Sequence, residues 1–128
     1  IADRIDMWIE VPLLKHSVLG ASRKLNVESS KEMRGKVKKA REHMHKRFAG
    51  AKRSRLNGDM SAKEIEKLVP LNEKAREILN TSAEKLQLSA RSYHKIIKLA
   101  RTIADLDESR FVDERHLLEA LQYRQKEN

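Results

Sequence analysis

The sequence predicts an all-α protein: a bundle of about five helices, preceded by one strand and a linker. With 128 residues the chain is long enough for one domain and too short for two full ones. It contains four Gly and two Pro, which are few turn formers for a fold of many short strands. Aromatic residues make up 4% of the chain, which argues against an aromatic-rich sandwich or barrel.

Residues 5–11 are predicted to form a strand, because apolar and polar side chains alternate there and Pro12 ends the pattern. One strand cannot bury its own apolar face. We therefore expect 1–12 to complete a sheet that lies mostly upstream of residue 1, and to be poorly paired within this chain. Residues 13–28 show no clear period and are predicted to be a linker.

A helical domain is predicted for residues 29–128, because polar cap residues precede each apolar-periodic segment. The expected N-caps are Ser29, Ser61, Asn72, Ser89 and Asp113. The helix after Ser29 is expected to run to about Ala49. Apolar residues spaced by three or four positions predict its buried face: Met33, Val37, Ala40, Met44 and Phe48.

The positive charge of the chain is concentrated in residues 31–55. This segment holds eleven Lys and Arg against two Glu, a net +9 that equals the formal charge of the whole chain. Three interpretations remain open: contact with nucleic acid, contact with another subunit, and a solvated helix face. Because aromatic residues do not interleave the cations, the first would involve phosphates, not stacked bases. Its candidate residues are Lys36, Lys38, Lys39, Arg41, Lys46, Arg47, Lys52, Arg53 and Arg55.

Several classes of site are excluded or disfavoured. Without cysteine there is no disulfide scaffold, thiolate metal site or cysteine nucleophile. No phosphate-binding loop of the GxxxxGK[ST] type occurs, and the five histidines lack metal-ligand spacing, so we expect no metal site. The chain opens with acids where a signal peptide would be basic, and no apolar run could span a bilayer, so we expect a cytoplasmic location without membrane contact.

Arg91 is the most informative single residue. It falls in the first turn of the helix after Ser89, where a cation opposes the helix dipole. An anion bound there would satisfy both the guanidinium and the free backbone amides. A simple surface cation is the alternative.

Four segments resemble the C-terminal part of magnesium-chelatase-like AAA+ ATPases, of the ComM/YifB type found in bacteria. They are DRIDMWIEVP at 3–12, KAREHMHKRF at 39–48, LSARSYHKIIKLARTIADLD at 88–107 and HLLEALQYR at 116–124. The third segment is the most specific. The resemblance implies that the strand is the last of an AAA+ core and that the helices form the lid of that core. The chain does not begin with Met, and we expect it to be a piece of a longer protein.

The resemblance also assigns roles to two arginines. Arg91 matches the sensor-2 arginine, which contacts the terminal phosphate of the nucleotide from the lid. Arg4 matches an arginine that acts in trans on the nucleotide of a neighbouring subunit. ATP and magnesium would be cofactors of the whole protein, with none bound by this chain alone. Its partners would be the upstream core, neighbouring subunits of a hexameric ring, and DNA.

Three functions remain open on this basis. The first is the lid of an ATP-driven DNA motor of the branch-migration and recombination type, with a basic helix that contacts DNA. The second is the lid of a magnesium chelatase subunit that drives metal insertion into a porphyrin, with the basic helix as a surface for subunit docking. The third is a free-standing helical DNA-binding module. In each case we expect no ATP hydrolysis by this chain alone.

Overall fold

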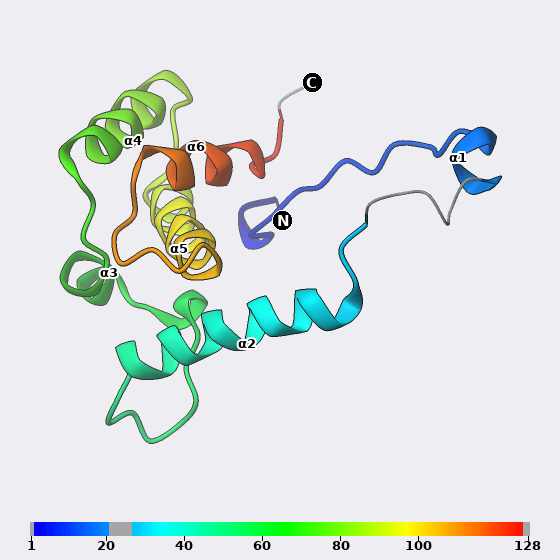
Figure 1. Cartoon of the computed structure of the whole chain (residues 1–128). Coiled ribbons are helices and arrows are strands. Elements are labelled where there is room, and N and C mark those ends of the chain that lie inside the picture. Colours follow the sequence, from blue (N-terminus) through cyan, green and yellow to red (C-terminus); the bar gives the residue numbers. More distant parts are fainter. Residues whose placement is uncertain (1, 21–26, 127–128) are drawn as a thin grey trace.

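The computed structural model describes residues 2–20 and 27–126, and residues 1, 21–26 and 127–128 lie outside its described part. Helices α3, α4, α5 and α6 pack together, and α2 leaves this bundle at one end (Figure 1). The helices are α1 (His16–Gly20), α2 (Ser30–Arg47), α3 (Ala62–Leu68), α4 (Glu73–Lys85), α5 (Ala90–Leu106) and α6 (Glu114–Gln122). Two 3-10 turns, η1 (Ala2–Arg4) and η2 (Asn57–Asp59), complete the fold, so the predicted all-α bundle is confirmed.

Each of the five long helices begins at the predicted cap residue. The hydroxyl oxygens of Ser29, Ser61 and Ser89 accept hydrogen bonds from backbone N–H groups three positions on, at 3.1–3.3 Å. The side-chain oxygen of Asn72 accepts from Ala75 N–H at 2.8 Å, and a carboxylate oxygen of Asp113 accepts from Arg115 N–H, two positions on, at 2.9 Å. These bonds satisfy amides that have no partner inside the helix, which is why the sequence locates the helix starts so closely.

Helix α5 lies at the centre of the core and contacts α2, α3, η2 and α6, while α4 packs on α6. Its buried face contains Ile96, Ile97, Ala100 and Ala104. The loop between α5 and α6 adds Val112, whose backbone forms an isolated parallel bridge with Leu71. One continuous core therefore holds α3 to α6 and the C-terminal end of α2.

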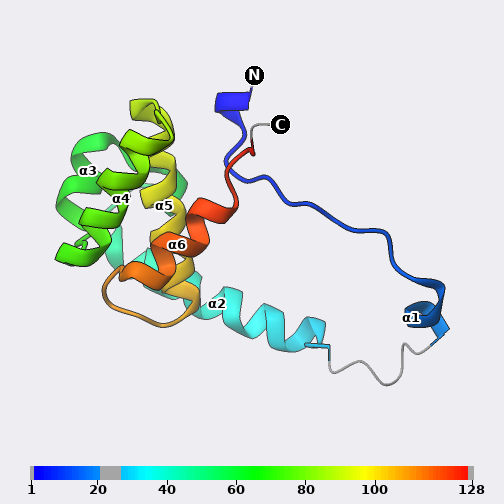
Figure 2. The ribbon, with the colours of Figure 1, turned by 90° about the horizontal axis from the view of Figure 1, so that it is seen from above.

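The predicted buried face of α2 is confirmed for one half of the helix and wrong for the other. Ala40, Met44 and Phe48 are buried, but Met33 and Val37 are 47% and 49% exposed. The physical reason is length: the N-terminal half of α2 extends past the bundle, as Figure 2 shows from above. The apolar stripe continues along the helix after its partner helices have ended.

The strand predicted at 5–11 does not form within the described residues. The segment is free of helix, and its one backbone–backbone hydrogen bond to the bundle runs from Trp8 N–H to Tyr123 O at 2.7 Å. A strand needs a second strand to pair with, and residues 2–20 and 27–126 provide none. The predicted linker at 13–28 contains a short helix, α1, and its residues 21–26 lie outside the described part.

No helix in 2–20 or 27–126 combines the length and the apolar character needed to cross a bilayer.

Candidate functional site

A buried carboxylate, Asp105, joins α2, η2 and α5. Its two oxygens accept hydrogen bonds from Nη1 and Nη2 of Arg47 at 2.9 and 2.7 Å, a two-pronged ion pair. The side-chain amide of Asn57 donates to the same carboxylate at 2.8 Å, and Arg101 lies one turn back on α5 with its Nη2 at 3.0 Å. This polar cluster fixes the C-terminal end of the basic helix against the bundle.

Arg101 is as buried as the carboxylate that it faces, with 2% of its surface exposed. Its guanidinium also donates to the backbone oxygens of Ser109 and Arg110, at 2.6 and 2.8 Å, and so holds the loop after α5. Burial lowers the pKa of Arg101, and the charge of Asp105 opposes this effect. The Nε atom of Arg101 has no hydrogen-bond partner among the described residues.

The cluster was not predicted from the sequence. The available signal for an ion pair was the i,i+4 spacing of Arg101 and Asp105 at the edge of the buried apolar face of α5. Nothing local indicates that Arg47 and Asn57 meet them, because 58 and 48 positions separate these residues from Asp105. Arg47 was predicted to contact nucleic acid, but the structure places it in this internal ion pair.

Arg55, another predicted contact residue, is also engaged within the molecule. Its guanidinium donates to both carboxylate oxygens of Glu64, at 2.6 and 2.9 Å, and lies 4.8 Å from the centre of the Phe48 ring. The Arg55 hydrogen bonds, followed by the bond from the Ser61 amide, lower the pKa of Glu64 from 4.5 to about 2. Arg55 therefore ties the loop after α2 to the start of α3.

The other predicted contact residues are exposed. Lys36 pairs with Glu28, and Lys39 pairs with Glu108 at 3.2 Å. Such exposed pairs are weak and screened by salt, so both lysines remain accessible to a stronger anion. The remaining five form no ion pair with any carboxylate in the described part of the chain. They are Lys38, Arg41, Lys46, Lys52 and Arg53.

Arg91 lies in the first turn of α5, as predicted, and its side chain is exposed. The cap Ser89 satisfies the amide of Ser92, and no carboxylate in the described residues pairs with Arg91. The guanidinium is thus available to an external anion at a helix N-terminus.

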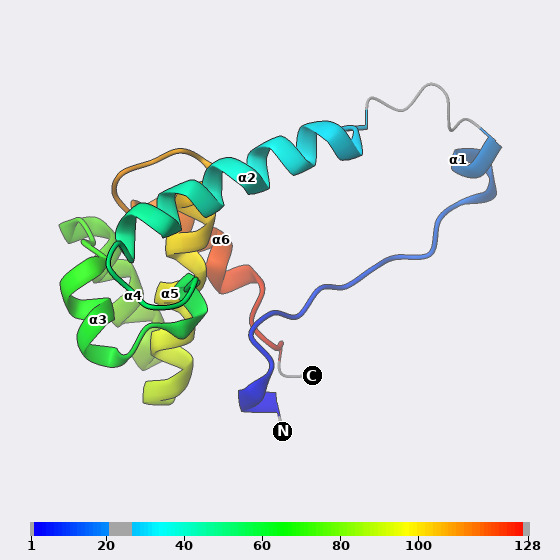
Figure 3. The ribbon, with the colours of Figure 1, turned by 90° about the horizontal axis from the view of Figure 1, so that it is seen from below.

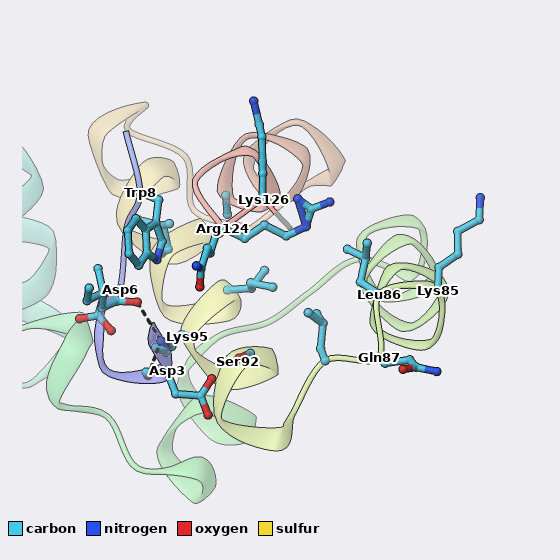
Figure 4. Close-up of a pocket in the computed structure, with 16 residues that line it drawn as sticks. Asp3, Asp6, Trp8, Lys85, Leu86, Gln87, Ser92, Lys95, Arg124 and Lys126 are labelled. Carbon is cyan, nitrogen blue, oxygen red and sulfur yellow. Dashed lines mark hydrogen bonds between the residues drawn. The ribbon is translucent and has the colours of Figure 1, made fainter. Parts of the chain in front are cut away.

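Arg4 is brought to the same half of α5 by a lysine that sequence reasoning missed. Lys95, one turn after Arg91, donates from Nζ to the backbone oxygens of Asp3 and Ile5, at 2.5 and 2.9 Å. These two residues flank Arg4 in the chain. The lysine anchors the N-terminal segment beside α5, as the dashed lines of Figure 4 show.

A groove of about 660 Å³ lies between this anchored segment, the turn after α4, and the C-terminal end of the described chain (Figure 4). Trp8, Ser92, Lys95 and Arg124 are among its lining residues, whereas Arg4 and Arg91 are not. Within the described residues no three His, Asp or Glu side chains are grouped so that they could hold a metal ion.

Comparison with known proteins identifies the family. A family model described as "Magnesium chelatase, subunit ChlI C-terminal" matches residues 27–124, which contain all five long helices. The chain belongs to this family. The match begins just before the cap of α2 and ends just after α6, so the family domain and the helical bundle coincide.

Three curated relatives align over 122 residues, or 95% of the chain. The protein named competence protein ComM of Haemophilus influenzae is 43% identical, and proteins named YifB from Escherichia coli K12 and Salmonella typhimurium are 34% and 31% identical. The chain fits the C-terminal region of a ComM-type protein. It spans 23% of the length of each of these relatives.

Proposed function

We propose that this chain is the C-terminal lid of a ComM-type AAA+ ATPase and that Arg91 contacts the terminal phosphate of the bound nucleotide. Family membership over residues 27–124 supports the lid, and the exposed, unpaired guanidinium of Arg91 at the start of α5 is the observation that carries its role. The 128 residues contain no phosphate-binding loop. ATP and magnesium would therefore bind mainly to a core outside this chain.

The chemistry of this role suits an arginine. A guanidinium is planar and permanently charged, and it can donate two hydrogen bonds to neighbouring phosphate oxygens. During phosphoryl transfer, negative charge spreads over the oxygens of the transferred group, and a fixed cation stabilises it. At the N-terminus of α5 the helix dipole acts in the same direction.

The second part of the proposal is that the whole protein is an ATP-driven DNA motor and that the basic segment 31–55 contacts DNA. The 43% identity to a protein named for competence supports this reading, as does the density of accessible cations on and after α2. Neutralising phosphates demands such a density, and sequence-independent contacts suit a motor that moves along DNA.

A magnesium chelatase subunit is the alternative, favoured by the description of the matching family. In that case α2 would dock on another subunit, and binding to DNA would be absent or insensitive to the charge of α2. A free-standing DNA-binding module is a further alternative, and a phosphate-binding loop upstream in the same polypeptide would exclude it.

The role of Arg91 is tested by Arg91→Ala in the full-length protein. We expect ATP turnover to fall on the order of 10²-fold, the effect of removing one donor to a developing charge. The fold should be unaffected, because exposed substitutions change stability by within about 0.5 kcal/mol. Steady-state ATPase assays and thermal denaturation measure the two quantities.

Arg76→Ala is the matched control, since Arg76 is an exposed arginine on α4 without a predicted role. It should leave turnover unchanged. Full activity of Arg91→Ala would contradict the sensor role, and hydrolysis of ATP by the purified 128-residue chain would contradict the assignment as a lid.

A further inference from the structure

One face of α2 carries a straight line of cations that differs from the set predicted by sequence. Lys31, Arg34, Lys38 and Arg41 follow one another at spacings of three, four and three, which puts them on a single face of the helix. This group is called the cationic stripe below. All four side chains are exposed, and the stripe borders the buried face of α2, because Arg41 lies three positions before the buried Met44.

The cationic stripe is separate from the cations that stabilise the fold. Arg47 and Arg55 are held by Asp105 and Glu64, whereas the four stripe residues form no ion pair with any carboxylate in 2–20 or 27–126. The N-terminal half of α2, which carries Lys31 and Arg34, extends beyond the other helices (Figure 3), whereas Arg41 follows the buried Ala40, where α2 meets the bundle. Lys31 and Arg34 were not among the predicted contact residues.

The cationic stripe opposes the stability of its own helix. Like charges three or four positions apart repel one another, and the stripe contains three such neighbouring pairs. Lys31 also lies in the first turn of α2, where the helix dipole disfavours a cation. An external line of negative charge would remove both penalties, which points to a polyanion as the ligand.

We propose that the cationic stripe is the DNA contact of the lid, and that it lies along the phosphate backbone of a duplex. This inference rests on the proposed function and specifies which face of α2 performs it. From Lys31 to Arg41 the helix rises about 15 Å, the axial length of about four base pairs. The stripe places one cation about every 5 Å along that length.

The ligand is a duplex backbone because of what the cationic stripe lacks. It has no aromatic side chain on which an unpaired base could stack, the usual device of single-strand binding. It also has no Asn or Gln, so the paired donors and acceptors that read adenine are missing. Because the proposed contacts are to phosphates, binding is expected to be largely independent of sequence and steeply dependent on salt.

The test compares two variants of the 128-residue chain with equal charge. The first replaces the four stripe residues: Lys31→Gln, Arg34→Gln, Lys38→Gln and Arg41→Gln. The control replaces four exposed, unpaired cations on α3 and α4: Lys63→Gln, Lys67→Gln, Lys74→Gln and Arg76→Gln. Gln has nearly the helix propensity of Lys and Arg, and circular dichroism verifies that both variants stay folded.

Binding to a labelled mixed-sequence duplex is measured by fluorescence anisotropy between about 50 and 200 mM salt. Each lost phosphate contact flattens the slope of log affinity against log salt by about 0.9. The slope of the stripe variant, which lacks four cations, should therefore be shallower by about 3.6. The control variant should keep the slope of the original chain. Tighter binding to the matching single strand than to the duplex would overturn the assignment of the ligand.

Three further outcomes separate this inference from the proposed function. Suppose that the original chain binds duplex with a steep salt dependence, but the salt slope falls equally in both variants or in neither. The assignment of the contact to the cationic stripe is then wrong, while DNA contact by the chain stands. If the original chain shows no salt-dependent binding to DNA, the DNA part of the proposed function fails as well. If poly-glutamate competes as well as unlabelled duplex, the stripe fits an acidic protein surface and the inference is overturned.

Discussion

Asp105 shows how one side chain separates structural from accessible cations in a strongly basic segment. It is 1% exposed and pairs with the buried Arg101 and the partly buried Arg47, which would otherwise have no counter-charge there. Desolvating charged groups is costly, and here the cost is offset by a two-pronged ion pair, an Asn57 hydrogen bond and backbone acceptors for Arg101. Arg47 is therefore committed to the fold.

We expect Asp105→Ala to lower the free energy of unfolding by about 3–5 kcal/mol, because it leaves the buried guanidinium of Arg101 and the partly buried one of Arg47 without a counter-charge. Urea denaturation of the 128-residue chain measures the change. Glu42→Gln, which alters an exposed carboxylate on α2, serves as the control and should change stability by within about 0.5 kcal/mol. A loss of less than about 1 kcal/mol for Asp105→Ala would show that the cluster rearranges without its anion.

Sequence reasoning at the scale of single residues identified exposed groups better than buried ones. It located Arg91 in the first turn of α5, because that position follows from one cap and the chain order. It placed Arg47 and Arg55 with the accessible cations, because local sequence does not show which carboxylate folds back to meet each of them. Tertiary contacts decide these partners, and nothing within a few positions of the arginines encodes them.

At the scale of elements, the residues at which helices begin were predictable from the sequence, and the length of each helix that packs on its neighbours was not. The five caps act within three or four residues, so the sequence contains all the information that they need. The apolar stripe of α2 was predicted to be buried over its full length, yet Met33 and Val37 extend beyond the bundle. Periodicity defines a face, whereas the length over which a partner covers that face depends on the whole fold.

The start of α3 should respond to acid through Glu64. Its pKa is lowered from 4.5 to about 2 by the Arg55 hydrogen bonds and the Ser61 amide, so the folded state favours the ionised form. The stabilisation is complete above pH 4.5 and is lost as the pH falls towards about 2.

Glu64→Gln isolates this effect, because Gln still completes the capping box at Ser61 but cannot pair with Arg55 as an ion. The variant should be less stable at pH 7, and its stability should fall less steeply than that of the original chain below pH 4.5. Urea midpoints across that range measure the slopes. Parallel slopes for the two proteins would contradict the role of the pair.

At the scale of the molecule, two arginines assigned by resemblance lie near one half of α5. Lys95 holds the carbonyls on both sides of Arg4, one turn after Arg91. The segment that carries Arg4 has few other ties: its described backbone binds the bundle again at Trp8, and residues 5–15 are exposed. A segment held by so few contacts can be placed elsewhere when a sheet is available to pair with residues 5–11.

We expect Arg4 to act on the nucleotide of the neighbouring subunit in a ring of the full-length protein. Arg4→Ala subunits then keep an intact nucleotide site but cannot serve their neighbour, and subunits with a disabled phosphate-binding loop keep Arg4 but no site. Each protein alone should hydrolyse ATP poorly. When the two are mixed in equal amounts, random assembly makes about one interface in four productive, so ATP turnover should recover to about a quarter of the unmodified level.

The same mixture made with Arg91→Ala in place of Arg4→Ala should show no recovery if Arg91 acts within its own subunit. Steady-state turnover across mixing ratios distinguishes the cases, because an Arg4 that serves its own subunit gives no recovery at any ratio.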